Sequence, residues 1–248
     1  MSHRFYVPGV HAVGETVALP AEEAEHAARV LRLKVGASVG VFDGRGGEYT
    51  GVVISANKHV SVRIDGLGTP AAEPTVSVTL VHAVAKGDKM DEVVRDAVMM
   101  GVAAILPIVT ARSETSVGAL ARGRRTDRWR RVAVASAKQC GRAVVPEVRE
   151  ACALQPTAGW LDAVGIPAPR LLLVEPSVEA GSSVDASRVP RPAGQTVALL
   201  VGPEGGWAPE ETAALAEGCQ RVCLGARTLR ADRAALVAVA ALFAVWGE

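Results

Sequence analysis

The stretch Leu199-Leu200-Val201-Gly202-Pro203-Glu204-Gly205-Gly206-Trp207 is the sharpest local signal of the chain. Its apolar start is typical of a buried strand, and Pro209 shortly after it is suited to open a helix. Ligands of open parallel sheets bind outside the carboxyl ends of strands, and glycine lets a ligand approach the backbone closely. The stretch therefore predicts a ligand site at a strand end. A tight turn with a solvated Glu204 is the simpler alternative.

This turn lacks the features of a nucleotide-phosphate site. It is neither a Walker A loop nor a GxGxxG fingerprint, because no Lys-Ser/Thr pair follows to hold phosphate and magnesium. A neutral or cationic cofactor therefore fits the turn better than a nucleoside polyphosphate.

Strands and helices alternate on both sides of the turn. Apolar runs predict strands at 76–85, 102–109, 171–175, 196–201 and 221–224. Helices are expected after a cap at Asp88, from a cap at Thr126 to Cys140, from Pro209 to about Gly218, and from Ala231 to Trp246. This alternation predicts an α/β fold, a parallel sheet covered by helices on both faces.

The first 65 or so residues have a different pattern. Short β-prone runs lie at 16–19, 38–42, 48–54 and 60–64, and one helix is expected at 22–33. Asp43-Gly44-Arg45-Gly46-Gly47 is a hairpin signal, and residues 66–74 form a turn-rich linker. We therefore predict a small β-barrel domain over residues 1–70 and a second domain over residues 74–248.

The bulk composition limits the classes of function. The 248 residues are 49% hydrophobic with a net charge of +1, so a strongly basic nucleic-acid footprint is absent. Any RNA contact must come from local patches, such as the arginines of 122–131 around Trp129. A solvated helix face with Trp129 in the core explains that cluster equally well.

Targeting signals and metal motifs are also absent from the sequence. No signal peptide is visible, and the longest apolar run, 234–246, is too short to cross a bilayer. The four cysteines have no CxxC pair, and the five histidines have no metal-ligand spacing. We expect a cytoplasmic protein with reduced thiols, no membrane partner and no metal. Since the run 234–246 is apolar all round, we also predict a homodimer through the C-terminal helix.

Several motifs together resemble a known family. The glycine turn is followed by Leu224-Gly225-Ala226-Arg227-Thr228-Leu229-Arg230-Ala231-Asp232, and this combination is highly specific. With 29–32, 42–44, 86–90, 112–113 and 139–146, the chain resembles the RsmE-type ribosomal-RNA uridine N3-methyltransferases of the SPOUT superfamily. The likeness covers essentially the whole chain in order.

The resemblance implies a fold, an activity and a cofactor. It implies a PUA-like RNA-binding barrel, then a SPOUT domain with a C-terminal trefoil knot. The implied reaction is methylation of N3 of one uridine in 16S ribosomal RNA by S-adenosylmethionine. The cofactor would lie bent among the loops Val174–Ser177, Leu200–Gly206 and Leu224–Arg230. The implied cofactor-binding residues are Glu175, Leu200, Val201, Gly202, Pro203, Glu204, Gly205, Leu224, Gly225, Leu229 and Arg230.

Two residues after the second motif are candidates for catalysis. Methyl transfer requires loss of the weakly acidic N3 proton, and a nearby cation lowers the pKa of N3. We expect Arg230 to supply this cation, and Asp232 to orient it or to accept a proton. The alternative is a surface salt bridge of little energetic worth.

The partner is expected to be ribosomal RNA, within an assembled small subunit. The candidate RNA-binding residues are Arg29, Arg32, Lys34, Lys86, Lys89, Arg112, Gln139 and Arg142.

The chain also departs from the family pattern. Ala231-Asp232-Arg233 replaces the usual Thr-Glu-Thr, Met99 and Lys138 stand where glutamates are common, and His82 replaces a usual glutamine. Two further hypotheses therefore stay open. One is a SPOUT methyltransferase for another RNA position, and the other is an inactive RNA-binding factor for ribosome assembly.

Overall fold

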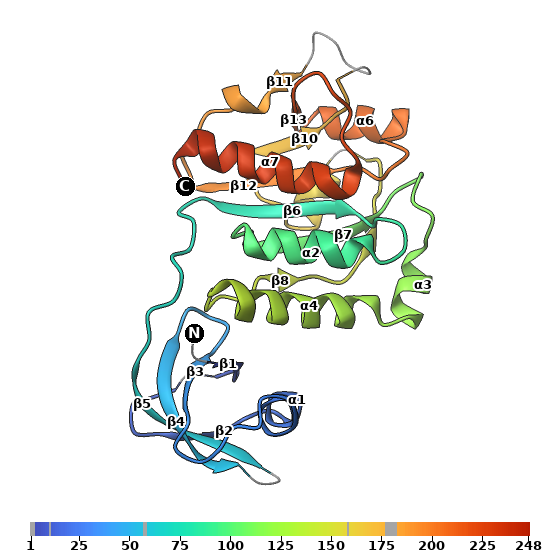
Figure 1. Ribbon diagram of the computed structural model, residues 1–248. Coiled ribbons are helices and arrows are strands. Elements are labelled where there is room, and N and C mark those ends of the chain that lie inside the picture. The colour runs from blue at the N-terminus through green and yellow to red at the C-terminus, as the bar shows by residue number, and fades with distance from the viewer. Residues whose placement is uncertain (1–2, 10, 57–58, 158, 177–182) are drawn as a thin grey trace. The chain divides into compact units, whose positions relative to one another are not determined.

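The computed structural model describes residues 3–9, 11–56, 59–157, 159–176 and 183–248 (Figure 1). The chain divides into two compact units. The first comprises Met1–Glu73 with Val134–Val145, and the second comprises Pro74–Ala133 with Pro146–Glu248. The linear domains 1–70 and 74–248 stay a prediction.

The first unit contains a five-stranded sheet in the order β1-β3-β4-β5-β2. Its strands are β1 (His3–Tyr6), β2 (Thr16–Ala18), β3 (Ser38–Phe42), β4 (Glu48–Ala56) and β5 (Val60–Leu67). Phe5, Val41, Val53, Val62 and Ile64 are fully buried in its core. The hairpin signal is confirmed, because Asp43 Oδ1 accepts hydrogen bonds from the backbone of Arg45 at 2.7 Å and of Gly47 at 2.9 Å.

The helix expected at 22–33 is shorter and changes type. α1 (Ala21–Glu25) continues as a π-helical segment, η1 (His26–Val30). Residues 31–33 are not helical. The apolar spacing of Ala24, Ala27 and Ala28 indicated a helix correctly, but it carries no information about the wider π-type winding.

The end of α4 (Arg125–Cys140) belongs to the first unit, where Arg4 caps it. Arg4 donates hydrogen bonds to the carbonyl oxygens of Ala137 at 3.1 Å, Lys138 at 2.8 Å and Arg142 at 3.0 Å. Its guanidinium also binds Glu48 in a bidentate pair. A cation at a helix C-terminus satisfies carbonyl groups that have no intrahelical partner and complements the helix dipole.

The second unit contains a parallel sheet, which confirms the predicted α/β class. The strand order is β11-β13-β10-β12-β6-β7-β8, and β9 pairs with β7. All of these pairs are parallel. The strands are β6 (Ser77–Ala83), β7 (Ala104–Val109), β8 (Glu147–Val148), β9 (Cys152–Ala153), β10 (Arg170–Leu173), β11 (Val184–Asp185), β12 (Thr196–Val201) and β13 (Gln220–Cys223).

Helices connect these strands. They are α2 (Lys89–Met99), α3 (Val117–Arg122), the start of α4, α5 (Trp160–Ala163), the 3₁₀ segment η2 (Ala186–Arg188), α6 (Pro209–Ala216) and α7 (Ala231–Trp246). α2 and α7 pack side by side on one face of the sheet (Figure 1). Within the described residues, no helix has both the length and the apolar composition that a membrane crossing requires.

Two predicted helix caps are wrong. α4 already begins at Arg125, so Thr126 lies inside the helix. Asp88 does precede α2, but within the described structure its side chain makes no capping hydrogen bond. Its carboxylate pairs instead with Arg125 at 3.3 Å. Arg125, which belongs to another helix, therefore binds the Asp88 carboxylate that was expected to cap the N-terminus of α2.

Candidate functional site

A cavity of about 780 Å³ lies at the carboxyl ends of β10, β12 and β13. Because these strands are parallel, the segments that follow them emerge at the same edge of the sheet. Residues 174–176 follow β10, residues 202–207 follow β12, and residues 224–231 follow β13, and all three segments line the cavity. The volume is within the range of about 300 to 1,000 Å³ that holds a cofactor-sized molecule.

The turn after β12 is held by Trp207. The indole Nε1 donates a hydrogen bond to the carbonyl oxygen of Leu173 at 3.0 Å, which ties this turn to the end of β10. Gly202 lies against the indole ring, and a Cβ at this position would meet ring atoms at 3.0 to 3.2 Å. Gly206 has a φ of +70°, a conformation that L side chains rarely adopt. Glycine is therefore required here for packing and for turn geometry.

Glu204 projects from the same turn toward two lysines. Its Oε1 accepts hydrogen bonds from the backbone N–H of Lys86 at 3.2 Å and from the Lys89 ammonium at 3.4 Å. Burial acts to raise the pKa of Glu204, but backbone hydrogen bonds and Lys89 outweigh it, so the pKa is lowered from its ordinary value. Glu204 is therefore an anion at neutral pH.

Arg112 holds the turn from its other side. Its Nη1 donates a hydrogen bond to the carbonyl oxygen of Gly205 at 2.8 Å, and its side chain lines the cavity. The sequence placed Arg112 among RNA-binding candidates. In the structure Arg112 contacts the glycine turn through Gly205, and its RNA role stays a prediction.

Glu211, in the first turn of α6, was missed by the sequence analysis. Its side chain is buried, and its two oxygens accept hydrogen bonds from the backbone of Ala111 at 2.7 Å and of Ala208 at 2.9 Å. Glu211 thereby joins the segment after β7 to the start of α6. A glutamate at the third position of a helix is half of a capping box, so the signal was present in the sequence.

Arg230 and Asp232 differ in their access to the cavity. Arg230 lines it, and its Nε lies 3.1 Å from Oδ1 of Asp232. The Arg230 side chain is 68% exposed, whereas that of Asp232 is 2% exposed. Asp232 is not among the described lining residues, and it also lies 3.6 Å from Arg233. Of these two side chains, the structure describes the arginine as lining the cavity, and Asp232 contacts that arginine.

His82 is fully buried at the end of β6. Nδ1 lies 2.6 Å from the carbonyl oxygen of Ala83, and Nε2 lies 3.4 Å from that of Ala231. Burial lowers the pKa of His82, and this effect exceeds the opposing contributions of the two carbonyls, Glu204 and Asp232. A neutral, hydrogen-bonded histidine is therefore the state that the surroundings favour.

Most of the predicted cofactor residues meet at this cavity. The lining includes Glu175, Val201, Gly202, Pro203, Glu204, Gly205, Leu224, Leu229 and Arg230. Leu200 and Gly225 are not among the lining residues that the structure describes, so their cofactor role stays a prediction. Leu200 is buried inside the sheet, and the N–H of Gly225 faces Asp185 at 3.3 Å. Ser177, the last residue of the first predicted loop, lies outside the described residues.

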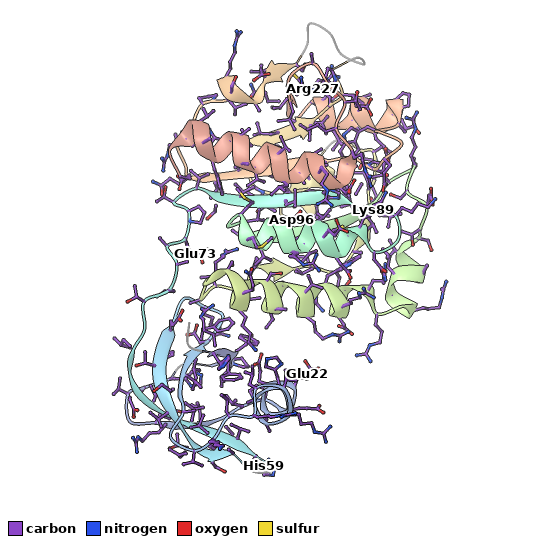
Figure 2. The ribbon with its side chains drawn as sticks, viewed as in Figure 1. Glu22, His59, Glu73, Lys89, Asp96 and Arg227 are labelled. Carbon is purple, nitrogen blue, oxygen red and sulfur yellow. The ribbon has the colours of Figure 1, made fainter. Side chains whose placement is uncertain are left out.

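Other lining residues were not named individually as cofactor-binding residues. They are Arg112, Leu173, Val174, Pro176, Gly206, Trp207, Pro209, Thr212, Ala213, Arg221, Arg227, Thr228, Ala231 and Ala234. Figure 2 labels Arg227 on the segment between β13 and α7. Several of these residues belong to the turns that the sequence identified. Thr212, Ala213 and Ala234 belong to helices instead, and tertiary packing decides which face of each helix borders the cavity.

The predicted RNA-binding residues are distributed over both units. In the first unit, Arg29, Arg32, Lys34 and Gln139 are exposed. In the second, Lys86 and Lys89 lie beside Glu204. Arg142 is a correction, because its guanidinium is buried and binds Glu73 at 2.6 Å. That ion pair removes it from any RNA-facing surface.

The arginine cluster around Trp129 is largely engaged within the protein. Trp129 is fully buried, which excludes it from stacking on a base. Arg128 pairs with Asp91 at 2.6 Å, and Arg130 pairs with Glu150 at 2.9 Å. The structure therefore favours the helix-face interpretation over the RNA interpretation.

Comparisons with known proteins agree with this geometry. Residues 72–243 match the family described as RNA methyltransferase domain, and residues 19–65 match the RNA methyltransferase PUA domain. The chain is 30% identical to Ribosomal RNA small subunit methyltransferase E of Synechocystis, over 99% of this chain and 78% of the relative. It is 31% identical to the Mycobacterium bovis protein of the same name, over 96% and 90%.

Solved structures extend the similarity to three dimensions. A putative methyltransferase of Legionella pneumophila, in complex with bound SAM, has a TM-score of 0.87 at 28% identity, covering 99% of this chain and 98% of that one. Ribosomal RNA small subunit methyltransferase E of Neisseria gonorrhoeae, bound to S-adenosyl methionine, has a TM-score of 0.85 at 29% identity with the same coverage.

Proposed function

This chain belongs to the ribosomal RNA small subunit methyltransferase E family, and from that membership we propose that it methylates N3 of one uridine in 16S ribosomal RNA. S-adenosylmethionine is the methyl donor, and small-subunit ribosomal RNA is the acceptor. The observation that carries the proposal is the cavity that the three turns form at the carboxyl edge of the sheet. The site of action would be the cytoplasm, where ribosomal RNA is found.

The cavity residues fit the cofactor. The carboxylates of Glu175 and Glu204 suit a cationic sulfonium group, and residues 201–205 line the cavity where a nucleoside would bind. When bound, the cofactor supplies a methyl group bonded to a positively charged sulfur. We assign its binding to Glu175, the turn 201–205, Leu224, Leu229 and Arg230.

The chain's own residues would align the acceptor and control its proton. Displacement at a methyl group needs in-line alignment and exclusion of water. Arg230 lines the cavity, and its cation would stabilise the N3 anion that forms when the N3 proton passes to water. Asp232 would orient the guanidinium through the 3.1 Å contact. Arg112 fixes the turn through Gly205 and is therefore a positioning residue.

Basic residues of each unit would hold the RNA backbone. Arg29, Arg32 and Lys34 lie on the PUA-type unit, and Lys86 and Lys89 lie at the cofactor edge. Phosphate contacts release counterions, so RNA binding should weaken steeply as salt is added. Affinity that does not change with salt would argue against these contacts.

We also infer a homodimer through α7. One face of this helix is buried, but Val237 and Val245 are 40% and 45% exposed beside Ala240 and Ala244. The helix is therefore not enclosed within one chain, and a second copy would cover this apolar strip. Light scattering at micromolar concentration should give twice the monomer mass. A monomer would contradict the inference.

Mass spectrometry of ribosomal RNA tests the function. Small subunits that lack the modification are incubated with the protein and S-adenosylmethionine, and the RNA is then digested to nucleosides. We expect one N3-methyluridine per subunit. Methylation at another position would support a different SPOUT specificity, whereas cofactor binding without methyl transfer would indicate that this RNA is not the substrate. Calorimetry that shows no binding of the methyl donor would support an inactive binding factor.

A further inference from the structure

A second, smaller cavity of about 270 Å³ lies at the carboxyl ends of β6 and β7. Val84, Ala85 and Lys86 follow β6 and form one wall. Glu114 comes from the segment after β7, and Leu120 and Ala119 come from α3. The cavity is built from the same edge of the sheet as the cofactor cavity, but from the next strands in the sheet order.

Glu204 connects the two cavities. In the sheet, β12 lies between β10 and β6, so the turn after β12 stands between the two groups of loops. Glu204 from that turn lines both cavities. Figure 2 labels Lys89, whose ammonium pairs with Glu204, at the start of α2. A molecule in the second cavity would therefore lie beside Glu204, next to the cofactor cavity.

The walls of the second cavity combine an apolar surface with charged groups. Val84, Ala85 and Leu120 are buried and provide the apolar part. Lys86 and Arg125 provide positive charge around it. A flat base packs on apolar walls, and its phosphate is attracted by cations. The volume is just below the range of about 300 to 1,000 Å³ for drug-sized ligands, so it suits a single nucleotide.

Lys86 has a partner that RNA can replace. Its ammonium lies 2.9 Å from Glu114, and both side chains are about two-thirds exposed, at 64% and 65%. An exposed ion pair of this kind contributes little to stability. Lys86 can therefore exchange Glu114 for a phosphate oxygen at small cost, while its backbone N–H keeps the contact with Glu204.

We propose that this second cavity receives the acceptor pyrimidine nucleotide after it has left its stack in the RNA. The proposal rests on the proposed function and names the binding site of its substrate. An enzyme that reacts with a base must take the base out of the stack and hold it in a pocket. Here the base would rest on Val84, Ala85 and Leu120, with its phosphate near Lys86. Its N3 would then point past Glu204 into the cofactor cavity, which Arg230 also lines.

Two substitutions on α3 provide a matched test. Ala119 is exposed and lines the cavity, whereas Ala121 is exposed on the same helix and is not among the described lining residues. Ala119→Phe would fill the cavity without burying new surface in the core, and Ala121→Phe is the control. The assays are calorimetric titration with S-adenosylmethionine and the initial rate of methyl transfer to small-subunit ribosomal RNA.

We expect Ala119→Phe to bind the cofactor within about twofold of wild type and to lose about tenfold or more in kcat/KM for RNA. Ala121→Phe should match wild type in both assays. Equal activity of the two variants would overturn the proposal, and so would a large loss of cofactor affinity in Ala119→Phe, since the cavity would then belong to the cofactor. An inactive wild type would instead contradict the proposed function.

A second variant keeps the proposal testable if Ala119→Phe does not fold. Lys86→Ala removes only an exposed side chain and leaves the backbone contact with Glu204. Loss of one phosphate contact should reduce the slope of log affinity against log salt by about one. An unchanged slope in Lys86→Ala would place the RNA phosphate elsewhere.

Discussion

Replacing Arg230 with alanine should separate catalysis from stability. The Arg230 side chain is 68% exposed, so its ion pair with Asp232 is worth about 1 kcal/mol or less, and Asp232 still lies 3.6 Å from Arg233. The free energy of unfolding should therefore fall by about 1 kcal/mol at most, which lowers Tm by about 4 °C or less.

The expected effect of this substitution on activity is larger. Removal of a group that stabilises charge in the transition state costs about 100-fold to 1,000-fold in sheltered sites. Because Arg230 is exposed to solvent, we expect a smaller loss in kcat of about tenfold or more, equivalent to about 1.4 kcal/mol. The loss should shrink as pH rises, since hydroxide then removes the N3 proton without a cation nearby.

The assay is the initial rate of methyl transfer at saturating cofactor and RNA, measured beside thermal denaturation by circular dichroism. Arg227→Ala is the matched control, because Arg227 belongs to the same segment and also lines the cavity. Full activity of Arg230→Ala, or an equal loss in both variants, would refute the specific role of Arg230.

Four further predictions concern the framework of the site. Glu211→Ala leaves the buried N–H of Ala208 and the partly buried N–H of Ala111 without their acceptor. The free energy of unfolding in urea should therefore fall by about 1 to 3 kcal/mol, and an unchanged stability would contradict this. Arg112→Ala removes the bond to Gly205, so calorimetry should show cofactor binding weakened by about fivefold, and unchanged affinity would remove its positioning role. The pKa of Glu204 is lowered in the folded protein, so the carboxylate stabilises the fold fully at pH values above its ordinary pKa of 4.5. This stabilisation is lost as the pH falls through the lower pKa of the folded state. The stabilities of wild type and Glu204→Gln, measured by denaturation, should therefore become equal only in acid, and equal stabilities at neutral pH would contradict this. Burial raises the pKa of Cys219 to about 11, so mass spectrometry should show slow alkylation of this thiol at pH 8, and rapid labelling would show that it is accessible as a thiolate.

The parallel sheet and its ligand edge could be predicted because local patterns determine them. Continuous apolar runs such as 196–201 mark strands buried on both faces, and α7 begins and ends where its composition indicated. Gly202 and Gly206 indicated a close turn, and the packing of Trp207 explains the first of them. The trefoil knot, implied only by family resemblance, stays a prediction.

The remaining features depend on contacts between segments that are distant in sequence. β1 has only four residues and pairs with β3, which lies more than thirty residues later in the chain. Its own sequence is therefore too short to identify it as a strand. Arg142 shows that the partners of side chains also depend on contacts between distant segments. A basic residue near a family motif predicted RNA contact, but Glu73 lies 69 positions away and binds it within the fold. Charge can be read from sequence, whereas the partner that neutralises it cannot.

A crystal structure of this chain with S-adenosylmethionine tests the central claim most directly. The account predicts the cofactor between the turn 202–207 and the segment 224–230, with its sulfonium near Glu204. The methyl group should be directed toward the second cavity, which α3 helps to line. A cofactor bound elsewhere on the chain, or bound here with its methyl group directed away from Glu204, would contradict it.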